Sequence, residues 1–199
     1  MGFSTLIDIL GSIVIGGMLM LILFRLNDAA VANSFRYNGE LIVQKNLVEV
    51  VNLLEFDLRK IGYCAVWENL PNPSKYIVSA DSNSIKYLTD VDSDGNVDTL
   101  SYYLGPSSEL SGTANPRDRM LYRRVNKSKP LSANLGVTMF KFTYFDVFGK
   151  EISFPITQPG EIQTMQIDIA VEDIAAYDEK YQRMFWRQIR LAARNLGNR

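Results

Sequence analysis

The sequence predicts an α+β fold in which a long N-terminal helix packs on an antiparallel β-sheet. Two observations carry this prediction. Residues 3–24 form an apolar run in which Asp8 is the only charged side chain, and apolar residues continue at helical spacing as far as Ile61. After Gly62 the pattern changes to the two-residue alternation that is typical of strands.

The apolar run is long enough to cross a membrane. Its 22 residues extend roughly 33 Å as a helix, about the thickness of the hydrocarbon core of a bilayer. A cleaved secretory signal is the alternative, since Ala29, Ala30 and Ala32 follow the run, but no basic side chain precedes it. The positive-inside rule taken alone would put the globular part in the cytoplasm, because Arg25 and Arg36 follow the span.

The residues after the span predict a continuation of the same helix. An apolar stripe recurs at spacings of three and four, and it consists of Leu47, Val51, Leu54, Leu58 and Ile61. Gly62 is suited to cap the helix, which we expect from about Thr5 to Ile61. The predicted organisation is a transmembrane helix (1–25), its amphipathic continuation (26–62) and a β-rich part (63–199) that packs on residues 40–62.

The β-rich part contains short runs of β-branched and aromatic residues separated by Gly, Pro and Asn turns. No helical pattern intervenes, which favours an antiparallel sheet. The runs predict strands at 76–78, 84–88, 99–104, 119–125, 137–145, 152–154 and 164–171. The tail from Tyr177 fits either a helix or a strand, and its periodicity alone slightly favours a helix.

Composition excludes several classes of function. The chain has 21 basic and 22 acidic side chains without a long run of one sign, which argues against nucleic acid as a partner. It has no histidine, and Cys64 is its only cysteine. The usual general base is therefore missing, and no nucleophile has an imidazole to activate it. We predict no catalytic residue, and a protein that is not an enzyme.

An acidic loop lies between two predicted strands. Oxygen-bearing side chains occupy its positions 1, 3, 5, 7 and 9, with Gly95 at position 6, and these ligands are Asp90, Asp92, Asp94, Asn96 and Asp98. The spacing matches most of a calcium loop, although position 12 is a serine where an EF-hand has glutamate. The alternatives are a Ca²⁺-binding hairpin and a solvated, metal-free Asp-Gly turn.

Several motifs together resemble the type IV pilin-like family, in particular its larger minor pilins and minor pseudopilins. Residues 2–8 (GFSTLID) are similar to the start of a prepilin, in which a glycine precedes phenylalanine. Residues 54–63 (LEFDLRKIGY) resemble the end of the family's long helix, and residues 194–196 (RNL) resemble its last strand. The resemblance covers nearly the whole chain. It implies a strand for the tail, in place of the helix that periodicity favours.

The resemblance implies a function in assembly. Such a chain is a non-enzymatic structural subunit that joins a type IV filament or a type II secretion pseudopilus through its N-terminal helix. Its partners are other pilin-like subunits and inner-membrane lipid, and a prepilin peptidase that cuts between Gly2 and Phe3. The expected location is the bacterial inner membrane, single-pass, with the globular part periplasmic or extracellular. The alternative is a monomeric, membrane-tethered binding module that depends on calcium.

Asp8 is the charged residue of the span, and it is a candidate for a contact between assembled subunits. A carboxylate in an apolar segment has a partner or reaches the interface. In a bundle of parallel subunits Asp8 can pair with the α-amino group of a neighbour; otherwise it lies at headgroup depth. The resemblance places the family's acid one residue earlier, at the fifth position after the glycine.

Overall fold

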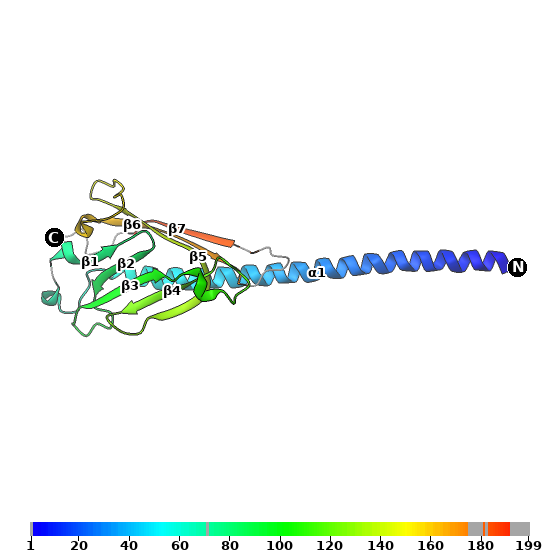
Figure 1. Cartoon of the computed structure of the whole chain (residues 1–199), viewed down its shortest axis with the longest axis horizontal. Helices are drawn as coiled ribbons and strands as arrows, with labels where there is room; N and C mark the ends of the chain where they lie inside the picture. The colour runs from blue at the N-terminus through cyan, green and yellow to red at the C-terminus, as the bar shows by residue number, and fades with distance from the viewer. Residues whose placement is uncertain (1, 71, 175–180, 182, 192–199) are drawn as a thin grey trace.

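A computed structural model describes residues 2–70, 72–174, 181 and 183–191. A long helix projects from a curled sheet of antiparallel strands, and the N-terminus lies at the far end of the helix (Figure 1). The predicted α+β class, with a long N-terminal helix on an antiparallel sheet, is confirmed.

Helix α1 comprises Gly2–Arg59, which extends about 87 Å at 1.5 Å per residue. The helix ends two residues before the predicted end, and Gly62 follows in the left-handed conformation with φ +68°. A Cβ at this position would lie 2.2 Å from a ring carbon of Tyr76. Glycine is therefore needed here for its backbone conformation and for the space that it leaves to the tyrosine.

The sheet is a seven-stranded antiparallel meander in which every strand pairs with the next along the chain. Its strands are β1 (Ile77–Ala80), β2 (Ser84–Thr89), β3 (Asp98–Leu104), β4 (Arg119–Val125), β5 (Leu131–Phe145), β6 (Thr164–Glu172) and β7 (Arg183–Leu191). Short 3₁₀ helices lie in the loops: η1 (Trp67–Asn69), η2 (Pro73–Lys75), η3 (Ser107–Leu110) and η4 (Pro159–Glu161).

Two of the strand predictions differ from the structure by more than two residues. The predicted strand at 152–154 is wrong: in this region only Glu151 forms a β-bridge, with Phe145. Pro155 follows directly and has no N–H to donate, so a ladder cannot extend beyond this short run. Strand β5 begins six residues before its predicted start at Val137, because the sequence does not reveal that it continues through Gly136.

The tail forms a strand where the structure describes it. β7 pairs antiparallel with β6 at the edge of the sheet, with Trp186 opposite Ile169. Trp186 packs against the core whereas Phe185 is exposed, which is the alternation of a strand. The strand is confirmed and the helix that periodicity favoured is wrong for these residues. The motif at 194–196 lies outside the described residues.

The core lies between α1 and the concave face of the sheet. α1 contacts β5, β6 and β7. Three residues of the predicted stripe, Leu54, Leu58 and Ile61, are fully buried, while Leu47 and Val51 are partly buried. The buried face also includes Val43 and Val50 and begins at Gly39. From Thr5 to Asn38 the side chains are exposed except that of Ala32, which is half-buried.

Candidate functional site

The exposed part of α1 meets the requirements of a membrane span. The helix is long and apolar enough to cross a bilayer. Asp8 is exposed near its start, and the Ser12 hydroxyl donates to the Asp8 carbonyl oxygen at 2.8 Å. Gly2 and Phe3, the expected processing pair, form the beginning of α1. These findings are consistent with a single-pass membrane protein.

Beyond the span, α1 carries apolar side chains on the faces that turn away from the sheet. One row has spacings of four and seven, and it consists of Val31, Phe35 and Ile42. A second row has spacings of four and seven and consists of Tyr37, Leu41 and Val48. Each of these side chains is at least 40% exposed. Such spacings keep each row on one side of a helix.

The acidic loop is built around Asp90, which is fully buried. Its carboxylate accepts hydrogen bonds from the backbone N–H groups of Ala65 (3.0 Å), Gly95 (3.0 Å) and Asp94 (3.2 Å). These donors, that of Ala65 first, hold the pKa of the Asp90 carboxyl below its ordinary value of 3.8. Asp90 therefore connects the loop to the segment after α1, where its own N–H donates to the Tyr63 carbonyl oxygen at 2.7 Å.

The structure brings together three of the five predicted ligands. Carboxylate oxygens of Asp90, Asp92 and Asp98 lie within 4.8 Å of one another. The Asp94 carboxylate instead accepts the N–H (2.7 Å) and the side-chain amide (2.8 Å) of Asn96, and both residues are exposed. Carboxylate oxygens are the donors that hard cations such as Ca²⁺ prefer, so the type of donor in this cluster fits such an ion.

The loop turns at Gly95, as its Asp-Gly sequence predicts. Gly95 has φ +87°, and a Cβ there would lie 2.7 Å from a methyl carbon of Val66. The Asp98 carboxylate accepts the N–H of Val91 at 3.2 Å and the side-chain amide of Asn126 at 2.6 Å. Asp98 therefore joins the loop to the turn after β4.

A buried ion pair between helix and sheet was missed by the sequence analysis. Asp57 lies on the buried face of α1, and its carboxylate accepts from Arg123 Nε of β4 at 2.7 Å and from the Tyr102 hydroxyl of β3. Burial and then the negative charge of Asp57 raise the pKa of Tyr102 above its ordinary value. The side chains of Asp57 and Arg123 are 4% and 19% exposed. We refer to these three residues as the helix–sheet ion pair.

A signal for this ion pair was present in the sequence. Asp57 stands between Leu54 and Leu58 on the apolar stripe, where a charge requires a partner when the helix is buried. The identity of the partner could not be derived, because Arg123 is 66 residues further along the chain.

Comparisons of the chain with models of protein families, with curated proteins and with solved structures found no match.

We expect Asp57→Ala to lower the free energy of unfolding by about 1–3 kcal/mol, because it leaves the buried Tyr102 hydroxyl and the half-buried Arg123 guanidinium without their acceptor. Urea unfolding of the full chain in detergent micelles, followed by tryptophan fluorescence, measures this loss. Glu55→Ala is the control, since Glu55 only pairs with Arg59 at the helix surface (3.6 Å), and such pairs contribute about 0–1 kcal/mol. Equal losses in the two variants would contradict the assignment.

We expect Asp90→Asn to lower the thermal midpoint of the full chain at neutral pH, because an amide presents one acceptor oxygen where the carboxylate presents two. The folded pKa of Asp90 is lowered, so the ionised group stabilises the fold above pH 3.8. This contribution is lost as the pH falls below that value. Thermal scans between about pH 7 and pH 2 should show that acid lowers the thermal midpoint less in the variant than in wild type. Asp92→Asn, at an exposed position, is the control, and identical pH profiles for Asp90→Asn and wild type would refute this role.

Proposed function

We propose that the chain is a non-enzymatic structural subunit, of the minor-pilin or pseudopilin kind. It assembles through its N-terminal helix into a type IV filament or a type II secretion pseudopilus. The observation that carries this proposal is the pair of exposed apolar rows on α1 beyond the membrane span. A helix that served only as a tether would have no need of apolar side chains on its water-facing sides.

The rows support lateral packing of α1 against the helices of other subunits. Apolar side chains at spacings of four and seven form the seam between packed helices. The first row begins at Val31, a few residues after the span, so the packing surface of the span continues into the globular part. The seam then runs from the lipid-embedded segment to Ile42 and Val48, beside the sheet.

The resemblance to prepilins supplies the other parts of the proposal. A prepilin peptidase cleaves between Gly2 and Phe3, and Asp8 pairs with the new amino terminus of a neighbouring subunit. The protein is held in the bacterial inner membrane, with its globular part in the periplasm or, within a filament, outside the cell. Gly11, Gly16 and Gly17 lie in the span, where a Cβ would meet nothing within 4 Å in the isolated chain. They leave room for close approach of another helix.

We expect the double variant Phe35→Ser, Ile42→Ser to lose most of its crosslinks to other pilin-like subunits, since it removes two apolar side chains from the first row. Both side chains are more than half exposed, so the fold and its thermal midpoint are retained. The measurement is crosslinking through single cysteines in residues 9–24 of the full chain, in cells. Lys45→Ser, on the polar side of the same helix, is the matched control.

N-terminal sequencing of the membrane-extracted protein provides an independent measurement, because processing makes Phe3 the first residue. An intact Met1, together with no crosslinks between helices, would refute membership of a filament.

A second candidate function is a membrane-tethered module that binds a ligand in a calcium-dependent way. The specific observation in its favour is the cluster of carboxylate oxygens from Asp90, Asp92 and Asp98. Like charges at this distance repel one another, and a cation relieves the repulsion. A bound ion would stiffen the β2–β3 loop and the segment after α1 to which Asp90 is hydrogen-bonded.

We expect Ca²⁺ at a hundred times its dissociation constant to stabilise the full chain by about 2.7 kcal/mol relative to a chelator. The increase in thermal midpoint should disappear in Asp92→Ala, which removes a ligand at an exposed position. It should persist in Asp94→Ala, because Asp94 lies outside the cluster. A wild-type midpoint that is the same with calcium and with chelator refutes the calcium site, as does a response that Asp92→Ala retains.

A further inference from the structure

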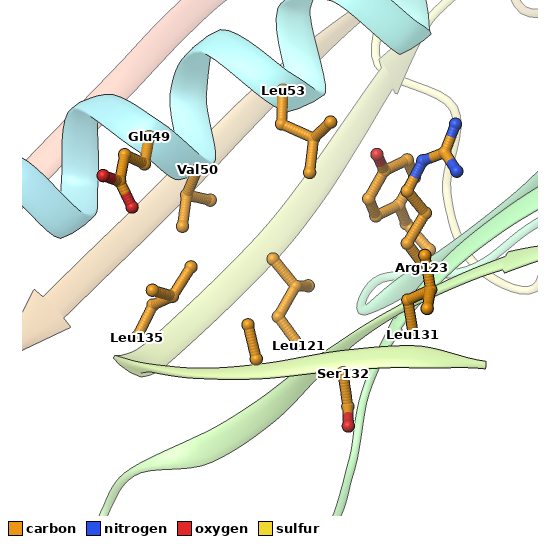
Figure 2. A pocket seen from close by; sticks show the side chains of 10 residues that line it. Glu49, Val50, Leu53, Leu121, Arg123, Leu131, Ser132 and Leu135 are labelled. Atoms are coloured by element: carbon orange, nitrogen blue, oxygen red, sulfur yellow. The ribbon is translucent and has the colours of Figure 1, made fainter.

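Strands β2, β3 and β4 have two different faces. Figure 2 shows the α1 side of β4 and of the beginning of β5, where Leu121, Arg123 and Leu135 line an apolar groove. β5 bends at Gly136 (φ +70°) at one end of this groove. Because side chains alternate along a strand, Arg124 lies on the opposite, outer face of the sheet, which is turned away from α1.

Positively charged side chains cross the outer face of these strands. The pairing of the strands places Ser101 of β3 opposite Lys86 of β2 and also opposite Arg124 of β4. Since neighbouring strands lie about 4.8 Å apart, the Cα atoms of Lys86 and Arg124 lie roughly 10 Å from each other. Lys127 follows in the turn after β4 and is exposed, as is Lys86. The three cations therefore gather on one part of the outer face.

A cavity of about 410 Å³ opens on this face and is lined by Lys86, Thr99, Asn126 and Lys127. Two reciprocal hydrogen bonds fix its polar lining. The Thr99 N–H donates to the side-chain oxygen of Asn126 at 2.8 Å, and the Asn126 N–H donates to the Thr99 carbonyl oxygen at 2.7 Å. The cavity is therefore formed before a ligand binds, and binding requires little further ordering of its backbone.

The cations of the outer face lack acidic partners. Among the residues that the structure describes, no carboxylate oxygen lies within 4.0 Å of a charged nitrogen of Lys86, Arg124 or Lys127. In the same part of the chain, the Nε of Arg124 is buried and has no hydrogen-bond partner. A buried donor without an acceptor is unfavourable, so this guanidinium favours an anion beside it.

One acidic side chain, Asp98, adjoins the cavity, and hydrogen bonds within the chain already hold it. Its carboxylate accepts the side-chain amide of Asn126 at 2.6 Å and the N–H of Val91 at 3.2 Å. Further along the same loop, Asp92 and Asp94 are exposed. An extended polyanion laid across this face would meet their like charge. The distribution of charge therefore favours a compact anionic ligand.

We propose that this cavity binds a compact oxyanion of the phosphate type, either free or as the phosphate group of a small molecule. Three cations match a ligand with two or more negative charges, whereas a single carboxylate would leave most of their charge uncompensated. Lys86 and Lys127 bind phosphate as point charges, and the guanidinium of Arg124 donates to its oxygens. The Thr99 hydroxyl supplies a further donor. Because the face is turned away from α1, the inference is independent of the proposed assembly.

Titration calorimetry of the full chain in an uncharged detergent, with inorganic diphosphate as the probe, tests the proposal. We expect one saturable site per chain. Binding should be weaker by about tenfold or more in the double variant Lys86→Gln, Lys127→Gln, which removes two charged contacts. The double variant Lys141→Gln, Lys150→Gln is the matched control, because it removes two exposed lysines that do not line the cavity. Thermal midpoints equal to wild type show that both variants are folded.

The same titration distinguishes the two sources of the phosphate group. Inorganic phosphate and glycerol phosphate are compared as ligands of the wild-type chain. Tighter binding of inorganic phosphate assigns the cavity to a free anion, and tighter binding of glycerol phosphate assigns it to a phosphate carried by a small molecule.

Three results would overturn the proposal. The first is a wild-type chain that shows no saturation by about 1 mM diphosphate. The second is equal weakening in the two double variants, since only the overall charge would then matter. The third is a long-chain polyphosphate that binds more tightly per phosphate than diphosphate does, which indicates an extended surface in place of the cavity. None of these results affects the filament proposal, which the crosslinks of α1 test separately.

Discussion

The structure depends on the buried ion pair of Asp57 with Arg123, to which Tyr102 adds a hydrogen bond. Apolar contacts hold α1 against β5, β6 and β7, but these contacts are not directional. The ion pair is directional, and it joins the helix to β3 and β4. A charge on the apolar face of the helix is stable only where the guanidinium meets it. It therefore fixes both the rotation and the height of the helix on the sheet.

The docking of α1 by this ion pair decides which faces of the helix remain exposed to solvent. With Asp57 turned into the core, the face that carries Phe35 and Ile42 and the face that carries Leu41 and Val48 point to solvent. The same attachment fixes the gap between α1 and β4, where an apolar groove lies. The apolar rows that we propose for assembly are thus consequences of how one helix is docked.

Much of the fold could be predicted from the sequence, because it depends on local periodicity. The helix, the cap at Gly62 and most of the strands follow from spacings of three to four residues and of two. The errors came where the local signal was insufficient. The run at 152–154 has a suitable composition but is followed by Pro155, and the start of β5 is interrupted by Gly136. The tail at 183–191 satisfies both periods, and only its pairing with β6 makes it a strand.

The acidic loop shows the same division on a smaller scale. Its spacing indicated five oxygen ligands. In the fold, however, Asp90 is buried and accepts hydrogen bonds from three backbone N–H groups, whereas the side chains of Asp94 and Asn96 bond to each other. The membrane-length helix, the antiparallel sheet and the position of the acidic turn could be predicted without a structure, since each follows from neighbours along the chain. The contact of Asp57 with Arg123, the exposure of the two apolar rows of α1 and the bend of β5 at Gly136 appear only once the chain is folded. These depend on contacts between residues far apart in the sequence, which no local pattern records.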